Sequence, residues 1–311
     1  MGNDTQAAEM HQRAVAYFRD LQLRIADAVE EADGSASFRE DHWQRPGGGG
    51  GYSRVLESGG VFEKAGVNFS EVHGEFSPEM AEQMPGEGLS FTATGTSLVL
   101  HPYNPYVPTV HMNVRLLTHG SKAWFGGGAD LTPYYPFRSD VIHFHKTWKD
   151  VCDRFAPEVD HGAMKRACDD YFHIKHRNEA RGVGGIFFDH FNSGNLERAF
   201  DFVRAVGDAF TQSYLPIVER RHDTVFVDSE KRFQEYRRGR YVEFNLIYDR
   251  GTLFGLKTDG RIESILMSLP PTVRYIYDYK PEPDSPEAAL TADWLQPRDW
   301  AEMNSEPENA R

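Results

Sequence analysis

Apolar residues recur at three- and four-residue steps along several stretches of the chain, which is the spacing of one face of a helix. This spacing predicts helices over residues 9–31, 139–155, 161–180 and 195–220. Asn195, at the start of the last stretch, suits the N-cap position of a helix. Four helices are therefore expected, one near the N-terminus and three between residues 139 and 220.

Short apolar runs bounded by turn residues predict strands between and after these helices. Three of the runs lie in the middle of the chain and three near its end, at residues 97–101, 110–118, 185–189, 241–248, 252–258 and 261–269. The turns Asp249-Arg250-Gly251 and Asp259-Gly260 separate the last three runs, and turns this short join antiparallel neighbours. The sequence therefore predicts the α+β fold class, with a partly antiparallel sheet and helices against it.

We expect the 311 residues to form a single domain, because no internal repeat or long linker divides them. An N-terminal helix precedes a body of sheet and helices over about residues 47–280. The glycine run at 47–51 is predicted to be a mobile loop that can close over a site. The polar, proline-rich segment 281–311 is predicted to wrap the surface.

Composition and charge exclude several classes of function. The 34 basic and 47 acidic residues give a net charge of −13, whereas nucleic-acid binding needs a basic surface. No run of about 18 apolar residues is present, so we expect no membrane-spanning segment. The two cysteines, Cys152 and Cys168, build neither a disulfide framework nor a zinc site. A reduced, cytoplasmic protein is therefore expected.

The run at 110–118 places an unusual set of polar side chains on one strand face. Alternate residues of a strand point to opposite faces, so the apolar positions from 110 to 116 form the core face. His111, Asn113 and Arg115 then share the other face, about 7 Å apart. If this strand pairs with the preceding one, Ser97 and His101 join them in one site. A solvated outer strand face is the alternative interpretation.

Two further segments offer chemistry. Asp130 follows three glycines that we expect to form a loop, where it can accept from an N–H group, act as a base or cap a turn. Arg261 follows Asp259-Gly260, a turn that can present N–H groups and a guanidinium to a carboxylate. Most of the other arginines are expected in surface ion pairs, among them Arg177, Arg181, Arg237, Arg238 and Arg240.

Six long stretches resemble one family, the oxygen-dependent coproporphyrinogen III oxidases of haem biosynthesis. These stretches are GGGGYSRVLESGGVFEKAGVNFSEVHGEF, SLVLHPYNPYVPTVHMNVR, WFGGGADLTPYY, YFHIKHRNEARGVGGIFFD, FTQSYLPIVERR and RRGRYVEFNLIYDRGTLFGLKTDGRIESILMSLPP. They run in the family's order from about residue 47 to 280. His190 follows Asp189 where many members have a second acid, so we expect no catalytic role at position 190.

The resemblance implies a large, mostly antiparallel sheet flanked by helices on both sides, in a homodimer. It implies oxidative decarboxylation of two propionate side chains of coproporphyrinogen III to vinyl groups. The product is protoporphyrinogen IX, oxygen is the electron acceptor, and carbon dioxide and hydrogen peroxide are released. The substrate contacts that it implies are Ser97, Asn113, Val114, Arg115, Asp259, Gly260 and Arg261. Residues 195–220 and 241–248 are candidates for the dimer contact.

Catalytic roles follow from the same resemblance and from the chemistry of the residues. His111 is implied as the proton donor, and we expect Arg115 to hold the reacting carboxylate. Our hypothesis for Asp130 is that it faces the four pyrrole N–H groups and helps to remove a proton. Because the protein is net acidic, it needs a locally basic site to hold a substrate with four carboxylates.

The resemblance also implies four histidine ligands of a divalent metal, namely His101, His111, His145 and His176. Their spacing forms no local ligand signature such as HExxH. The electron-rich, reduced macrocycle can react with oxygen directly, so we expect oxygen as co-substrate and no organic redox cofactor. Two other functions stay open at this point. One is a histidine-liganded, non-haem metal oxygenase acting on another acidic substrate, and the other is a porphyrin carrier without chemistry.

Overall fold

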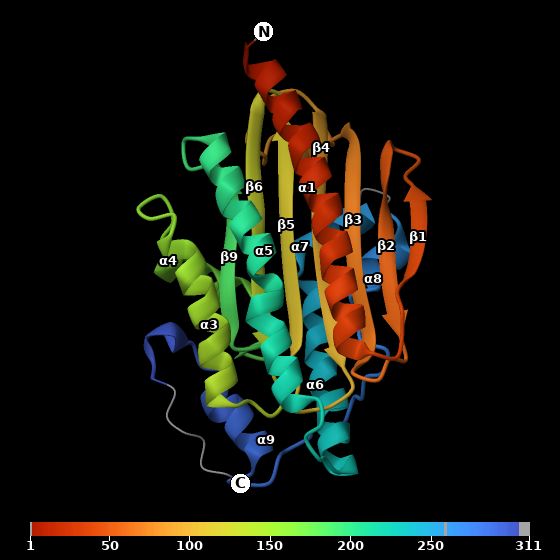
Figure 1. Ribbon diagram of the computed structural model, residues 1–311, viewed down its shortest axis with the longest axis vertical. Helices are drawn as coiled ribbons and strands as arrows, with labels where there is room; N and C mark the ends of the chain where they lie inside the picture. The colour runs from red at the N-terminus through yellow and green to blue at the C-terminus, as the bar shows by residue number, and fades with distance from the viewer. Residues whose placement is uncertain (1, 258–259, 305–311) are drawn as a thin grey trace.

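An antiparallel β-sheet forms the middle layer of the computed structural model, which describes residues 2–257 and 260–304 (Figure 1). In these residues seven strands pair in the order β1-β2-β3-β4-β5-β6-β9. Their bounds are Arg39–Gln44 (β1), Gly49–Glu57 (β2), Phe62–Glu75 (β3), Ser90–Pro102 (β4), Thr109–His119 (β5), Lys122–Thr132 (β6) and Gly184–Phe191 (β9). Every step but the last joins strands that are consecutive in the chain. A separate two-stranded ribbon pairs His173–Ile174 (β7) with Glu179–Ala180 (β8).

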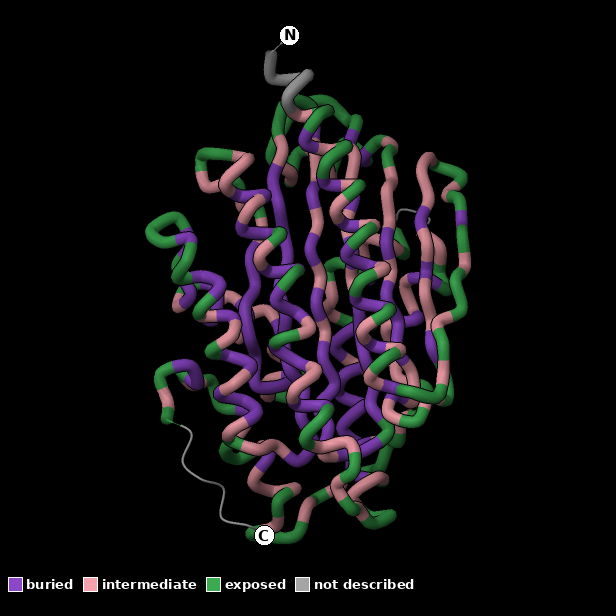
Figure 2. Tube along the Cα trace, viewed as in Figure 1, coloured by how far each residue is buried: buried purple, intermediate pink, exposed green. Residues whose placement is uncertain are grey.

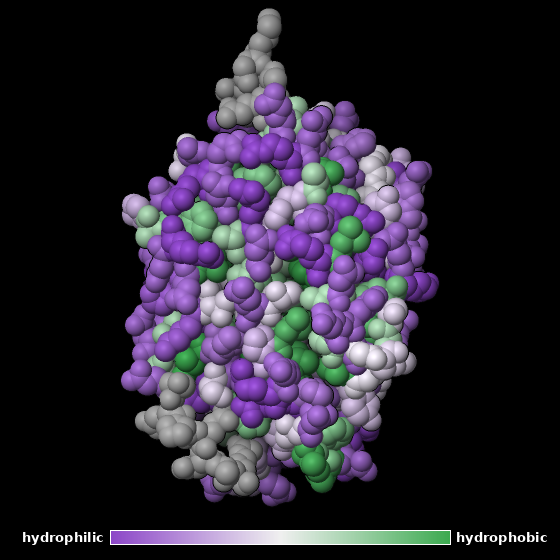
Figure 3. All heavy atoms as spheres, viewed as in Figure 1, coloured by the Kyte–Doolittle hydropathy of each residue, from purple (hydrophilic) through white to green (hydrophobic). Residues whose placement is uncertain are grey.

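Three long helices cover one face of the sheet, α1 (Gly2–Asp33), α3 (Arg138–Asp153) and α5 (Leu196–Arg221) (Figure 1). Helix α1 packs on β3 to β5, α5 on β5 and β6, and α3 beside α5 and β9. Alternate apolar positions of the strands meet the apolar stripes of these helices in the main core (Figure 2). The outer surface of this layer is mostly hydrophilic (Figure 3), as expected when each helix buries only one stripe.

The opposite face carries α6 (Asp228–Ile247), α7 (Arg250–Lys257) and α8 (Ile262–Leu266), which lie behind the sheet in Figure 1. Helix α4 (His161–Tyr171) packs against β9, and α2 (Pro78–Ala81) is a single turn before β4. The chain continues through α9 (Pro286–Ala289), a π-helical turn (Leu290–Trp294) and a 3-10 turn (Trp300–Glu302). The α+β class and the large antiparallel sheet with helices on both sides are confirmed.

The predicted strands at 241–248, 252–258 and 261–269 are wrong, because this region is helical. Helix α6 extends from Asp228 through the first of them and buries Phe233, Tyr241 and Phe244 at helical spacing. The apolar run after Tyr241 has the pattern of a strand when it is considered alone. Together with the arginine-rich stretch before it, it has the spacing of a helix. Residue 258 lies outside the described residues. The predicted helix at 161–180 ends at Tyr171, where the β7–β8 ribbon begins.

Two further predictions about loops are corrected. The glycine run at 47–51 is a turn followed by the start of β2, and it is not a loop over a site. A Cβ at Gly51 would lie 2.5 Å from the Trp43 ring and 2.3 Å from the Phe69 carbonyl oxygen, so the bare backbone permits close packing. The C-terminal segment does more than wrap the surface, because Leu290 and Trp300 are fully buried.

No helix in the described part of the chain combines the length and apolar character that crossing a bilayer requires. This finding agrees with the absence of a long apolar run in the sequence.

A buried ion pair between the sheet and α6 gives a prediction about stability. Arg238 is fully buried and donates to Glu63 at 2.7 Å and to the Pro102 carbonyl at 2.9 Å. Burial would raise the pKa of Glu63, but the charges of Arg238 and Lys231 hold it below its ordinary value. We expect Glu63→Gln to lower the free energy of unfolding by about 2 kcal/mol at pH 7, because it leaves a buried charge poorly compensated.

The sign of the pH dependence follows from the lowered pKa of Glu63. The stabilisation is complete above the ordinary glutamate pKa of about 4.3 and is lost as the pH falls through the lower pKa of the folded state. Urea unfolding should therefore separate wild type from Glu63→Gln at pH 7, and the difference should shrink as the pH falls below about 4.3. Glu197→Gln is the control, because its pair with Arg13 is about half exposed on both sides. Equal losses in the two variants would contradict this account.

Candidate active site

The register of β4, β5 and β6 places the predicted polar residues on one face of the sheet. Ser97 lies opposite Asn113, and Val99 lies opposite His111. On the other side His111 lies opposite Asp130. Directly paired residues of antiparallel strands point to the same face. The pairing that the sequence left open is therefore confirmed, and this face lies away from the core under α1 and α5.

His111 and Asp130 form a hydrogen-bonded pair across β5 and β6. The His111 Nδ1 atom lies 2.8 Å from the Asp130 Oδ1 atom. Asp130 is only 1% exposed, while His111 is half-buried. A buried carboxylate accepts at this contact, so Nδ1 donates and the Nε2 atom of His111 is the acceptor of the ring. Asn113 approaches Nε2 with its amide nitrogen at 3.4 Å.

Arg181 holds Asp130 from the other side. One of its terminal nitrogens donates to both oxygens of Asp130 at 2.8 Å, and the other donates to Asn245 at 2.8 Å. Burial alone would raise the pKa of Asp130, but the charge of Arg181 and the hydrogen bond from His111 hold that pKa below its ordinary value. Asp130 is therefore a carboxylate at any working pH, and it is paired on both oxygens.

The guanidinium of Arg181 is 2% exposed and is packed among aromatic rings. Its central carbon lies 4.1 Å from the ring centre of Phe172, 4.5 Å from that of Tyr241 and 4.8 Å from that of Phe244. The prediction that Arg181 lies in a surface ion pair is wrong. Nothing in the local sequence marked it, since its partners come from β6 and α6, far away along the chain.

Arg115 extends over the strand next to its own. It donates to Asn113 Oδ1 at 3.1 Å and to Asp189 Oδ1 at 3.0 Å. A Cβ at Gly126 would lie 2.8 Å from the nearest Arg115 nitrogen, so the guanidinium occupies the space that a side chain at 126 would take. The glycines that we expected in a loop are thus part of β6, and one of them makes room for Arg115.

A polar row crosses the sheet at the level of Asn113. Its members are paired from strand to strand, from β1 to β5, and they are Asp41, Ser53, Asn68, Ser97 and Asn113. At about 4.8 Å per strand the row is roughly 19 Å long. Arg261 is ion-paired with Asp41 at one end, and Arg115 is bonded to Asn113 at the other. Two cations therefore approach the same sheet face from opposite ends of one polar row.

The remaining substrate contacts implied by the resemblance do not lie together. Val114 is fully buried on the core face, so its side chain does not share the face of His111. Gly260 closes the end of α7, donating its N–H to the Gly255 carbonyl at 2.8 Å. Asp259 lies outside the described residues.

The four histidines implied as metal ligands do not gather. His101 is buried and donates from Nε2 to the Ser268 carbonyl at 2.8 Å, and His145 is buried and donates to the Val183 carbonyl at 3.1 Å. His176 contacts Glu243 at 2.7 Å. In the part of the chain that the structure describes, no three His, Cys, Asp or Glu side chains form a group that could hold a metal ion. These residues therefore do not fit a shared metal centre.

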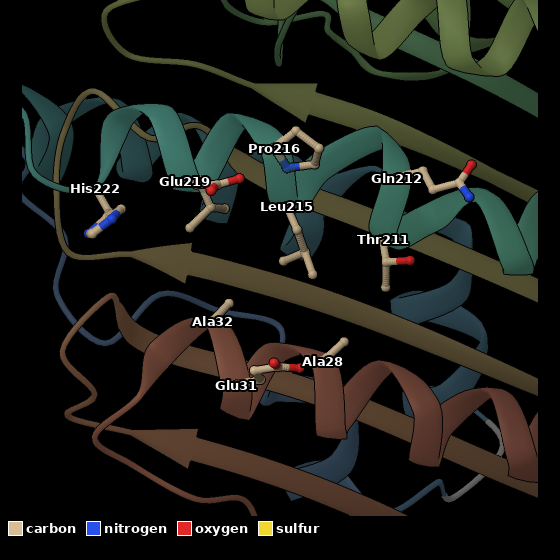
Figure 4. Close-up of a pocket in the computed structure, with 10 residues that line it drawn as sticks. Ala28, Glu31, Ala32, Thr211, Gln212, Leu215, Pro216, Glu219 and His222 are labelled. Carbon is tan, nitrogen blue, oxygen red and sulfur yellow. The ribbon is translucent and has the colours of Figure 1, made fainter.

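The described residues also line a groove of about 510 Å³ between α1 and α5 (Figure 4). Ala28, Leu215 and Pro216 contribute apolar walls, and Glu31 and Glu219 contribute carboxylates. The groove lies on the α1–α5 side of the sheet, with the core between it and His111. It contains none of the predicted site residues, and its acidic walls do not suit a ligand with several carboxylates.

A half-buried imidazole hydrogen-bonded to a buried carboxylate, beside an arginine on an antiparallel sheet, is typical of enzymes that transfer protons. The comparison with protein families specifies which one. Residues 13–300 match the model described as Coproporphyrinogen III oxidase, and the chain belongs to this family of haem-biosynthesis oxidoreductases.

Proposed function

We propose that the protein is the oxygen-dependent form of coproporphyrinogen III oxidase. For each of two propionates, the reaction R–CH2CH2COOH + O2 gives R–CH=CH2 + CO2 + H2O2. Two such steps convert coproporphyrinogen III to protoporphyrinogen IX. The observation that carries the proposal is the polar sheet face, where His111, Asn113 and Arg115 alternate along one strand beside Asp130.

Electrostatics support a tetra-anionic substrate at this face. The protein carries a net charge of −13 and would repel such a ligand over most of its surface. Arg115 and Arg261 offer guanidinium groups at the two ends of the polar row, and each can bind a carboxylate through two parallel hydrogen bonds. We assign Arg115 to the reacting propionate because it shares its strand with His111.

Proton transfer is assigned to the Nε2 atom of His111. When His111 takes up a proton there, the buried carboxylate of Asp130 stabilises the imidazolium through Nδ1, as in other histidine–carboxylate pairs. The burial of Asp130 disfavours our earlier hypothesis that it faces the pyrrole N–H groups. Asp130 then acts on the substrate through His111, and Arg181 positions Asp130.

No organic redox cofactor is needed in this scheme, because each propionate loses two electrons as it becomes vinyl and carbon dioxide, and oxygen accepts them to form hydrogen peroxide. A divalent metal was implied at four histidines, and three of them are engaged with carbonyl or carboxylate oxygens of the protein. The proposal therefore assigns no step to a metal and keeps oxygen as the only co-substrate.

We also propose that the protein is a cytoplasmic homodimer. Large apolar side chains are exposed at the ends of α6 and α7, at the start of α8 and in the segment after α8, and they are Leu246, Ile247, Leu256, Ile262, Tyr275 and Ile276. Large apolar side chains that are exposed in one protomer are candidates for burial in a protein interface. Of the two candidate contacts, this favours residues 241–248 over the α5 helix. A monomeric mass by light scattering would contradict the dimer.

The proposed function is tested with chelator-treated protein and coproporphyrinogen III, in air and under nitrogen. We expect vinyl product in air only, with two molecules of carbon dioxide and two of hydrogen peroxide per ring. Metal analysis of the same sample accompanies the assay. Activity that is lost with the chelator and restored by iron or manganese would favour the metal oxygenase. Binding of the porphyrinogen without oxygen uptake would favour the carrier.

A further inference from the structure

A carboxylate of the protein itself occupies the position between two arginines at the edge of the polar face. The Oδ1 atom of Asp189, on β9, lies 3.0 Å from Arg115, and its Oδ2 atom lies 3.5 Å from Arg250 at the start of α7. The backbone N–H of His190 also donates to Asp189 at 3.0 Å. Two cations and one N–H thus converge on a single carboxylate.

Each arginine is held independently of Asp189. Arg115 keeps its hydrogen bond to Asn113 and its place over the bare backbone of Gly126. The guanidinium carbon of Arg250 lies 4.8 Å from the ring centre of Tyr171. The site between the two cations would therefore persist if the carboxylate moved away.

The ion pairs of Asp189 with the two arginines are accessible to water, so another carboxylate can replace Asp189 in them. The side chain of Asp189 is 20% exposed, that of Arg115 is 36% exposed and that of Arg250 is 59% exposed. Ion pairs this accessible to water contribute little free energy, so a carboxylate from outside can replace the aspartate at small cost. A fully buried pair, such as that of Arg181 with Asp130, does not have this property.

We propose that Asp189 is a placeholder for a substrate carboxylate. It occupies the site between Arg115 and Arg250 until a propionate of the substrate displaces it. Because of this competition, only a substrate with an ionised carboxylate binds productively. A substrate whose propionates are esterified cannot displace it. The inference rests on the proposed function, because it takes Arg115 as the group that binds the reacting propionate.

The pair of Arg261 with Asp41 repeats the pattern at the other end of the polar row. Both arginines that the resemblance implied as substrate contacts are thus paired with an aspartate of the protein. The side chains of this second pair are also accessible, at 30% for Arg261 and 34% for Asp41. Placeholder carboxylates at both ends would neutralise the cations until the substrate arrives.

The test uses the full-length variant Asp189→Ala and sodium propionate as the probe. Removing the competitor should lower KM for coproporphyrinogen III by about two- to fivefold, the range of an exposed ion pair. Propionate should raise the thermal midpoint of Asp189→Ala more than that of wild type, compared with sodium chloride at equal ionic strength. Asp189→Asn, which keeps the shape and removes the charge, should show the same lower KM.

Asp201→Ala is the matched control, because Asp201 pairs with Arg204 on α5, away from the polar face. It should change neither KM nor the response to propionate. The inference is overturned if propionate stabilises Asp189→Ala no more than wild type. The propionate measurement does not depend on turnover. A wild-type protein without oxidase activity would reject the proposed function, and the propionate measurement would still show whether Asp189 competes for the carboxylate site.

Discussion

Asp130→Asn should lower kcat of the oxidative decarboxylation by about 10²–10⁴-fold, with a much smaller change in KM. The asparagine keeps the shape of the side chain but no longer stabilises a positive charge on His111, and its amide can hold the imidazole in the wrong tautomer. Since Asp130 is 1% exposed and paired with Arg181, the substitution removes no direct contact with solvent or ligand. Steady-state kinetics of purified variants measures both constants.

The chain offers a matched control for the loss of a buried carboxylate. Asp140 on α3 is 4% exposed and forms ion pairs with Arg220 and Arg221, on the other side of the sheet from His111. Asp140→Asn should lower stability without lowering kcat. Turnover like that of wild type in Asp130→Asn would reject the role given to the His111–Asp130 pair.

Arg181→Met should be strongly destabilising. It leaves the carboxylate of Asp130 buried without its counter-ion, which costs about 3–5 kcal/mol of the free energy of unfolding. The same change lets the pKa of Asp130 rise, because the charge of Arg181 is the main influence that lowers it against burial. The pH–rate profile should then lose activity on its acid side at a higher pH than wild type, in addition to a lower kcat.

A double variant separates the two effects of Arg181. Arg181→Met combined with Asp130→Asn removes both charges, so it should recover part of the lost stability and none of the lost activity. Arg238→Met is the control, since Arg238 is equally buried and pairs with Glu63 and not with Asp130. It should be destabilised to a similar extent with a smaller loss of kcat. Equal losses of kcat in the two arginine variants would mean that Arg181 only supports the fold.

The strand face of the site could be predicted from the sequence because its information is local. Alternation along 110–116 separates core from polar positions within one strand, and the register then confirms that His111, Asn113 and Arg115 point away from the main core. Helices with a long apolar stripe were predicted for the same reason. The periodicity of apolar residues along a helix or strand shows which of its faces is buried, but not which segment packs against that face.

Contacts between distant segments could not be predicted in this way. Arg181 and Asp189 come from segments after β6, and only the pairing of β6 with β9 and the packing of α6 bring them to the site. The helices after Asp228 were missed because a short apolar run, considered alone, fits a buried strand or one part of a helix equally well. A fully buried arginine is also rare enough that charge alone predicts a surface position.

The central claim is that the substrate binds on the α6–α8 side of the sheet, with a carboxylate at Arg115 and the ring beside His111. A crystal structure with coproporphyrin III, the stable oxidised ring with the same four propionates, tests it most directly. We predict a propionate within hydrogen-bond distance of Arg115, in the place of Asp189, and the ring edge against His111. A ring bound in the groove between α1 and α5, with the Arg115–Asp189 pair intact, would contradict the account.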